Sequence, residues 1–396
     1  MGRVRLLGKR YAVGVRALPR RLLPGLLLPG LLLTGVPGGS AAESSGVASA
    51  TTQASDAPSR LHLRPVDRAG LREVVQPLRD GTTRLETTAY SLVAVTWRGE
   101  RTPTVAIRVH GRDRWQGWRR LEPLEDLGES SRVHGTEPLW VGLADGIQVR
   151  VTGAADDVEL VLIDPGSDPA SGPATTAASG KPRGAAAKKR ATPKVAPRPD
   201  LHRRDNWGAN ERWRSTGPKY NRTIQQVHLH HTATANDYKR GEVRGILRSI
   251  YRYHTKSLRW SDIGYNFLVD RFGRIWEGRA GGPGRPVRGA HTLGFNSTST
   301  GIAVIGNFEQ KAPRDEVVTA LVRLAAWKLD AYGRNPRGRV TVYSHGSDRY
   351  PAGRRVRLRV IDGHRDTNDT ACPGQLLYDL LPTIRDRARH RVDRFS

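Results

Sequence analysis

The chain has 396 residues, of which 37% are hydrophobic, and its formal net charge at pH 7 is +27. This length exceeds one ordinary domain and indicates two, and the low apolar fraction indicates that part of the chain lies outside any core. The charge favours polyanionic partners such as nucleic acid, anionic lipid or acidic wall polymers, without choosing among them. The single cysteine, Cys372, excludes an intramolecular disulfide, so this residue either packs in a core or binds a metal.

Residues 1–42 have the pattern of a signal peptide. Basic residues precede an apolar run at 22–36, and small residues follow at 40–42. Prolines interrupt the run, which is shorter than the ~20 residues that a membrane-spanning helix needs. We therefore expect a secreted protein without a stable membrane span, with a retained anchor helix as the alternative. The Arg20-Arg21 pair leaves Sec and twin-arginine export both open.

Residues 43–58 are rich in Ala, Ser, Thr and Gly and are expected to form a flexible spacer. From 59 to 165, short β-branched and apolar runs follow one another at close spacing. The clearest runs are 91–97, 104–109, 147–151 and 158–163. Because no long helical period separates them, they predict a separate all-β accessory domain that resembles a sandwich.

Four tryptophans lie in this β-rich stretch: Trp97, Trp115, Trp118 and Trp140. The favoured interpretation is that they fill a small core. The alternative is a binding module whose exposed rings stack on sugars.

Residues 166–200 are expected to form a disordered basic linker. Small residues and prolines dominate, and a basic run follows from Lys181 to Arg198. Such a composition cannot bury enough apolar area to offset the entropy of ordering. The linker is either a solvated spacer or an electrostatic tether to acidic polymers, and the sequence leaves both open.

Residues 201–396 mix strand and helix patterns and predict an α/β or α+β domain. We expect strands at 226–231 and 301–306, a hairpin over 263–278, and amphipathic helices around 243–253 and 317–328. A last helical segment begins near Leu376, with Pro382 expected to end or kink it.

Two clusters carry residues suited to chemistry. The first is the run from His228 to Thr232, at a strand end, and the second runs from His364 to Gly374 and contains Cys372. Imidazole and thiolate both suit zinc, and a catalytic zinc site needs three protein ligands and an open position. One histidine of the first cluster, with His364 and Cys372, would supply those ligands. By spacing alone, a core histidine and a buried thiol explain the pattern equally well.

A longer set of motifs resembles the type 2 N-acetylmuramoyl-L-alanine amidases and the peptidoglycan recognition proteins, which share one fold. The similar segments, in order, are Arg204-Asp205-Asn206-Trp207-Gly208-Ala209, His230-His231-Thr232, Trp260–Phe267, Glu277-Gly278-Arg279, Gly289-Ala290-His291, Asn296, Gly301-Ile302-Ala303, Gly306-Asn307-Phe308, Gly363–Asp366 and Thr370–Gly374. The resemblance implies a mixed central β-sheet flanked by helices over 201–396. The high Arg, Ala and Gly content and the two-domain layout are similar to those of exported actinobacterial amidases.

The resemblance also assigns roles to individual residues. It implies that His230, His364 and Cys372 bind Zn²⁺ and that Tyr265 acts beside the metal on the attacking water or the oxyanion. Thr370, the other catalytic candidate, stands where some relatives have a lysine, and because Thr supplies no positive charge, more of the oxyanion stabilisation would fall on zinc. The candidates for lining or bracing the substrate groove are His291, Asn296, Arg279 and His231.

Two histidines beside His230 need separate treatment. His231 should point away from His230, because neighbouring strand residues face opposite sides, and this favours a structural role. His228 should share the face of His230. It departs from the apolar residue usual in the family, and we expect it to pack beneath the metal, with an exchange of ligands as the alternative.

The function implied is zinc-dependent hydrolysis of the amide between N-acetylmuramic acid and L-alanine in peptidoglycan, by a secreted protein associated with the cell wall. The alternative is a peptidoglycan-binding protein without catalysis, and the presence of Cys372 favours the enzyme. Nucleic acid is not an expected partner, because the sequence has no recognised nucleic-acid motif and the leader directs the protein outwards.

Overall fold

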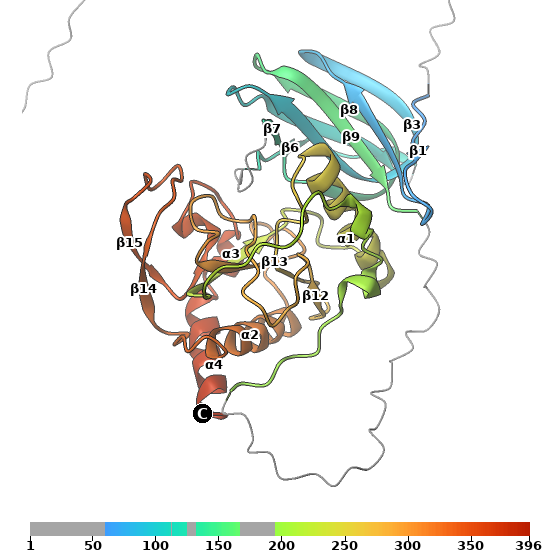
Figure 1. The fold of residues 1–396 in the computed structure, drawn as a ribbon. Coiled ribbons are helices and arrows are strands. Elements are labelled where there is room, and N and C mark those ends of the chain that lie inside the picture. The colour runs from blue at the N-terminus through green and yellow to red at the C-terminus, as the bar shows by residue number, and fades with distance from the viewer. Residues whose placement is uncertain (1–59, 112, 125–131, 167–194) are drawn as a thin grey trace, which may run out of the picture. The chain divides into compact units, whose positions relative to one another are not determined.

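The computed structural model describes residues 60–111, 113–124, 132–166 and 195–396 (Figure 1). The predicted signal peptide and spacer, and residues 167–194 of the predicted linker, lie outside the described residues. The linker prediction is wrong for Ala196, which is buried in the core of the C-terminal domain and donates its N–H to Asp330 Oδ2 at 2.6 Å. Within the described residues, no helix combines the length and the apolar character needed to cross a membrane.

The described residues of the N-terminal domain form strands and no helix. These strands are β1 (Arg64–Pro65), β2 (Arg72–Pro77), β3 (Gly81–Arg98), β4 (Thr104–Gly111), β5 (Arg114–Trp115), β6 (Arg119–Leu121), β7 (Val133–Gly135), β8 (Leu139–Thr152) and β9 (Asp156–Asp164). They pair in the order β1-β2-β9-β3-β8-β4-β5, with β6 on β4 and β7 on β3. The long strand β3 pairs with β8 through its first part and with β9 through its second part. The all-β accessory domain is therefore confirmed.

The tryptophans of this domain divide into two kinds. Trp97 and Trp140 are buried, at 2% and 3% exposure, as the core interpretation predicts. Trp118 is 37% exposed and stacks beneath the guanidinium groups of Arg108 and Arg150. The core interpretation is therefore wrong for Trp118, which lies just before β6 and packs on arginines at the surface.

The C-terminal domain contains both kinds of element. Its strands are β10 (Gln226–His231), β11 (Phe267–Val269), β12 (Ile275–Glu277), β13 (Ser299–Val304), β14 (Arg339–Tyr343), β15 (Arg355–Arg359) and β16 (Ile361–Gly363). Its α-helices are α1 (Val243–Arg252), α2 (Asp315–Asp330), α3 (Gln375–Tyr378) and α4 (Leu381–Asp393). Short helical turns are η1 (Arg204–Trp207), η2 (Glu211–Trp213), η3 (Arg240–Glu242), η4 (Tyr253–Ser257) and η5 (His364–Asp366).

A mixed five-stranded sheet lies at the centre of this domain. Its order is β12-β11-β13-β10-β16, and every pair is parallel except β11 with β12. All residues of β10 and β13 are buried, as expected for strands covered on both faces. The mixed sheet with flanking helices is the fold that the resemblance implies, and it is confirmed.

The two faces of the sheet have different covers. Helices α2 and α4, which lie together along one side of the domain in Figure 1, pack on the face that carries Val227 and Leu229. The opposite face packs Ala303 and Ile305 against Ile246 and Leu247 of α1. Because side chains alternate along β10, His228 and His230 lie on this second face.

The structure tests two local predictions of the C-terminal domain, the hairpin over 263–278 and the effect of Pro382. The predicted hairpin is β11–β12, and Gly273 in its turn has a φ of +75°, which glycine adopts without strain. Pro382 neither ends nor kinks a helix. It lies in the first turn of α4, where a proline costs no backbone hydrogen bond. The hairpin of β14 and β15 was not predicted.

Candidate metal centre

Three residues far apart in the sequence meet at the carboxyl end of the central sheet. His230 lies near the end of β10, His364 begins the turn that follows β16, and Cys372 lies in the loop before α3. Their potential ligand atoms all lie within 4.8 Å of one another, and all three residues are buried. Cys372 Sγ is 3.8 Å from His230 Nδ1, and the His230 and His364 ring centroids are 4.6 Å apart.

This group fits a zinc ion. Two imidazoles and a thiolate are borderline-soft donors of the kind that zinc prefers, and three ligands leave a position open. His364 Nε2 is buried and has no hydrogen-bond partner within the described residues, which a metal bond would explain. Burial lowers the pKa of His364 to about 3 and the pKa of His230 well below its ordinary value. Both imidazoles are therefore neutral at pH 7 and can donate a lone pair.

Backbone and hydroxyl groups position the cysteine. The backbone N–H of His231 donates to Cys372 Sγ at 3.4 Å, a contact that favours the thiolate. Thr370 Oγ1 accepts a hydrogen bond from the Cys372 N–H at 3.1 Å, and the Arg365 N–H donates to the Cys372 carbonyl at 2.9 Å. The loop therefore presents Cys372 in one orientation before any ion binds.

His291 contacts His230 from behind. His291 Nδ1 lies 3.0 Å from His230 Nε2, and His291 is only 1% exposed. Two glycines make room for the ring. A Cβ at Gly301 would lie 2.3 Å from His291 Cγ, and a Cβ at Gly289 would lie 2.4 Å from His291 Cδ2. The position of this buried ring suits a role in orienting His230. It suits the lining of a substrate groove less well.

His228 packs beneath the ligands, as expected, and lies outside the metal-binding group. Its Nδ1 is 2.5 Å from Asp362 Oδ1 on the neighbouring strand β16, and both residues are fully buried. Burial raises the pKa of Asp362 to about 6 against the opposing effect of His228. Asp362 was missed in the sequence. Its position two residues before His364, a candidate ligand, is the signal that would have drawn attention to it.

Tyr265 lies beside the ligands. Its ring centroid is 5.6 Å from that of His230, and the residue is 6% exposed. Behind it, the His254 ring centroid lies 5.9 Å from Tyr265 and 4.5 Å from Trp260. His254 Nδ1 accepts a hydrogen bond from the Gly264 N–H at 3.1 Å. His254 was also missed, because it lies within a helical stretch with no motif around it.

The sequence has known relatives. A family model described as N-acetylmuramoyl-L-alanine amidase matches residues 220–375. Peptidoglycan-recognition protein SC2 of Drosophila simulans is 32% identical over 155 residues, which cover 39% of this chain and 71% of that protein. The chain belongs to the superfamily of N-acetylmuramoyl-L-alanine amidases and peptidoglycan recognition proteins.

Two further relatives carry the two names of this superfamily. Peptidoglycan-recognition protein SA of Drosophila melanogaster is 38% identical over 32% of this chain and 60% of its own length. The human N-acetylmuramoyl-L-alanine amidase is 30% identical over 47% of this chain and 28% of its own length. A second model, Rv3811 N-terminal galactose-binding domain-like, matches residues 46–192.

The remaining candidate residues of the amidase-like domain make local hydrogen bonds. Asn296 Oδ1 accepts from the N–H groups of His291 and Thr292, so Asn296 braces the loop that carries His291. Arg279 is buried and donates to Ser261 Oγ at 2.7 Å. The His231 ring points away from His230, as predicted, and its Nδ1 accepts from the Phe308 N–H at 3.3 Å. A role in binding substrate stays a prediction for these residues.

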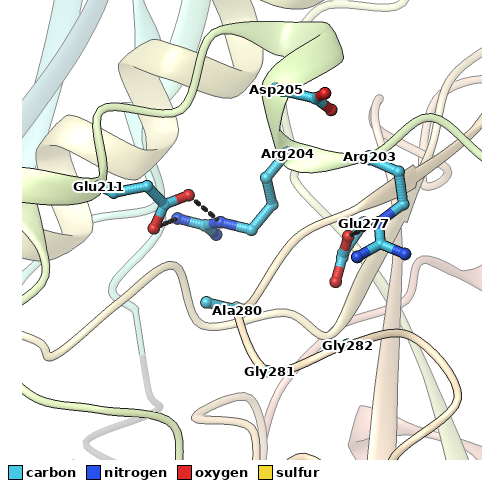
Figure 2. A pocket seen from close by; sticks show the side chains of 8 residues that line it. All are labelled: Arg203, Arg204, Asp205, Glu211, Glu277, Ala280, Gly281 and Gly282. Atoms are coloured by element: carbon cyan, nitrogen blue, oxygen red, sulfur yellow. Dashed lines mark hydrogen bonds and ion pairs between the residues drawn. The ribbon is translucent and has the colours of Figure 1, made fainter.

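A pocket of about 420 Å³ lies beside other motifs of the superfamily, and none of the three candidate ligands lines it (Figure 2). Its walls hold two arginine–glutamate pairs. Arg204 Nε lies 2.7 Å from Glu211 Oε1, and Arg203 Nε lies 2.6 Å from Glu277 Oε2. Arg204 also pairs with buried Asp262 at 3.1 Å. These bonds join the segment around Arg204 to the segment around Glu277, so both motifs serve the fold here.

Proposed function

We propose that the C-terminal domain is a zinc-dependent N-acetylmuramoyl-L-alanine amidase. The observation that carries this proposal is the group formed by His230, His364 and Cys372, whose ligand atoms lie within 4.8 Å of one another. Membership of a superfamily that contains the human amidase supports it. The peptidoglycan-recognition proteins among the relatives support peptidoglycan as the substrate.

The reaction breaks the amide between the lactyl group of N-acetylmuramic acid and L-alanine. The oxygen of water forms a bond to the carbonyl carbon, the C–N bond breaks, and a proton passes to the alanine nitrogen, which leaves a carboxylic acid and an amine. A zinc ion, when bound, would lower the pKa of water towards ~7 and polarise the carbonyl.

The residues of the chain would then prepare this step. His230, His364 and Cys372 would hold the ion, with Cys372 oriented by the His231 N–H and by Thr370. We assign the Tyr265 hydroxyl to donate a hydrogen bond to the developing oxyanion, because its ring lies beside His230. Thr370 would act through Cys372 and would supply no charge of its own.

The alternative is a protein that binds peptidoglycan without cutting it. Several relatives are named for recognition alone, so this alternative has to be tested. The buried group of three ligands favours the enzyme, because binding a muropeptide requires no free thiol beside two neutral imidazoles.

The experiment is muropeptide release from purified peptidoglycan, measured together with the zinc content of the protein. The wild-type chain is compared with Cys372→Ala and His364→Ala, and with His390→Ala as a matched control, since His390 is exposed on α4. We expect about one zinc per chain, free stem peptides from wild type and control, and loss of both in the ligand variants. Bound zinc without release would favour the recognition protein.

We also propose that the protein is secreted and acts at the cell wall. The basic and apolar pattern of residues 1–42 supports export, and the substrate class supports the location. The basic stretch within 166–200 would add attraction to acidic wall polymers. Cell fractionation of the full chain, with and without residues 1–42, tests the export signal directly.

A further inference from the structure

The β14–β15 hairpin presents a row of arginines to solvent. Its register places Arg339 opposite Arg359, Thr341 opposite Arg357, and Tyr343 opposite Arg355. All six of these side chains are exposed, and Tyr343 is 59% exposed. The alternate residues, Val342, Val356 and Leu358, are buried against Phe295. One face of the hairpin is therefore core, and the other is basic with an aromatic ring.

Folding alone does not account for this basic face. Like charges directly opposite each other destabilise a strand pair, as Arg339 and Arg359 must do. In the part of the chain that the structure describes, no carboxylate forms an ion pair with Arg339, Arg355, Arg357 or Arg359. The positive charge of the face is therefore available to a ligand outside the domain.

The hairpin is hydrogen-bonded to the segment that carries two of the three candidate metal ligands, His364 and Cys372. In the loop between β14 and β15, Ser347 Oγ donates to the Thr367 carbonyl at 2.8 Å. Asp348 accepts from the Asn368 side chain at 3.1 Å and from the Asp369 N–H at 2.7 Å. The three residues contacted, Thr367, Asn368 and Asp369, lie between His364 and Cys372 in the sequence. Figure 1 shows the hairpin set apart from the central sheet, at the margin of the domain.

We propose that this arginine face, formed by Arg339, Arg355, Arg357 and Arg359, binds the peptidoglycan polymer through carboxylates of stem peptides outside the segment being cut. This inference rests on the proposed amidase function, which makes that polymer the substrate. Guanidinium groups suit carboxylates because they bind them with paired hydrogen bonds. Tyr343 would pack on the sugar or peptide between the charged groups. The protein would then prefer the polymer to soluble fragments.

Charge-matched variants of the full chain test the proposal. The hairpin variant is R355Q/R357Q/R359Q, and the control is R314Q/R323Q/R394Q, which removes equal charge from exposed positions on and beside α2 and α4. Binding is measured by co-sedimentation with sacculi stripped of other polymers, before and after amidation of their carboxylates. Cys372→Ala is included in each chain so that nothing is cleaved during the assay.

We expect the hairpin variant to bind untreated sacculi about tenfold more weakly than the control variant. Amidated sacculi should bind both variants equally. In chains that retain Cys372, the ratio of turnover on sacculi to turnover on a soluble muropeptide should fall in the hairpin variant alone. Equal binding of untreated sacculi by the two variants would overturn the proposal. So would a hairpin variant that loses affinity for duplex DNA, measured in parallel, and keeps its affinity for sacculi. If wild type cleaves no muropeptide while the binding difference persists, the amidase function fails and the arginine face stands.

Discussion

His291 Nδ1 lies 3.0 Å from His230 Nε2, and this contact determines which nitrogen of His230 can bind a metal. His230 Nδ1 faces Cys372 Sγ, so a metal held by both binds Nδ1, and the Nε2–H then donates a hydrogen bond to His291 Nδ1. A histidine held in this way has its tautomer and ring orientation fixed before the ion arrives.

Replacing His291 by alanine should weaken zinc binding by about 10–100-fold, the usual effect of removing a partner behind a ligand. His291→Gln, whose amide oxygen accepts a hydrogen bond, should recover part of the affinity. Competition with a chromophoric chelator measures this directly, without an activity assay. An unchanged affinity in the alanine variant would show that His230 is oriented by other contacts.

The glycine beside His291 gives a separate test of the same arrangement. Gly301→Ala would place a Cβ 2.3 Å from His291 Cγ, and buried Gly301 lies in the middle of β13, where neither group can move freely. We expect about 1–3 kcal/mol of lost stability and weaker zinc binding. Gly217→Ala is the control, since nothing lies within 4 Å of its Cβ. Denaturant unfolding of the two variants should separate clearly, and equal midpoints would refute the packing argument.

The sequence predicted individual elements of the central fold and the ligand group for different reasons, and the mixed sheet itself was implied by the resemblance. The strand at 226–231 and the helices around 243–253 and 317–328 follow from apolar periodicity, which reflects burial directly. His230, His364 and Cys372 follow from the order of motifs, because the spacing between His364 and Cys372 is also compatible with a buried core. The structure supplies what spacing lacked, namely the distance between the two clusters.

The parts that were missed depend on contacts between distant segments. Asp362 and His254 are buried polar residues whose partners lie on other elements, and no local pattern identifies such pairs. The β14–β15 hairpin was missed because arginine occupies its exposed positions and hides the alternation of its valines. The two roles left open for His291, lining or bracing the groove, illustrate the same limit, since the sequence does not show that its ring turns inward.

Tyr265→Phe removes a hydroxyl and leaves the packing of the ring unchanged. If that hydroxyl stabilises the oxyanion, kcat should fall by about 10²–10³, while zinc content stays at the wild-type level. Tyr332→Phe is the control, because the Tyr332 hydroxyl donates to the Gly284 carbonyl at an exposed position away from the ligands. Parallel losses of kcat and zinc would instead assign Tyr265 to the structure of the metal centre.

The pH dependence of stability should reveal His254, which binds no metal in this arrangement. Burial lowers the pKa of His254 from 6.5 to about 3 in the folded protein. Between these values the unfolded chain binds a proton that the folded protein does not, so this contribution is fully present above pH 6.5 and is lost as the pH falls towards 3. His254→Asn, whose amide oxygen can accept the Gly264 N–H, should remove a slope of about 1.4 kcal/mol per pH unit from the unfolding free energy between pH 6 and 4. Urea unfolding of the metal-free protein across this range measures the slope. A variant with the wild-type slope would mean that His254 takes up its proton in the folded state, and that the bond from Gly264 does not hold it neutral.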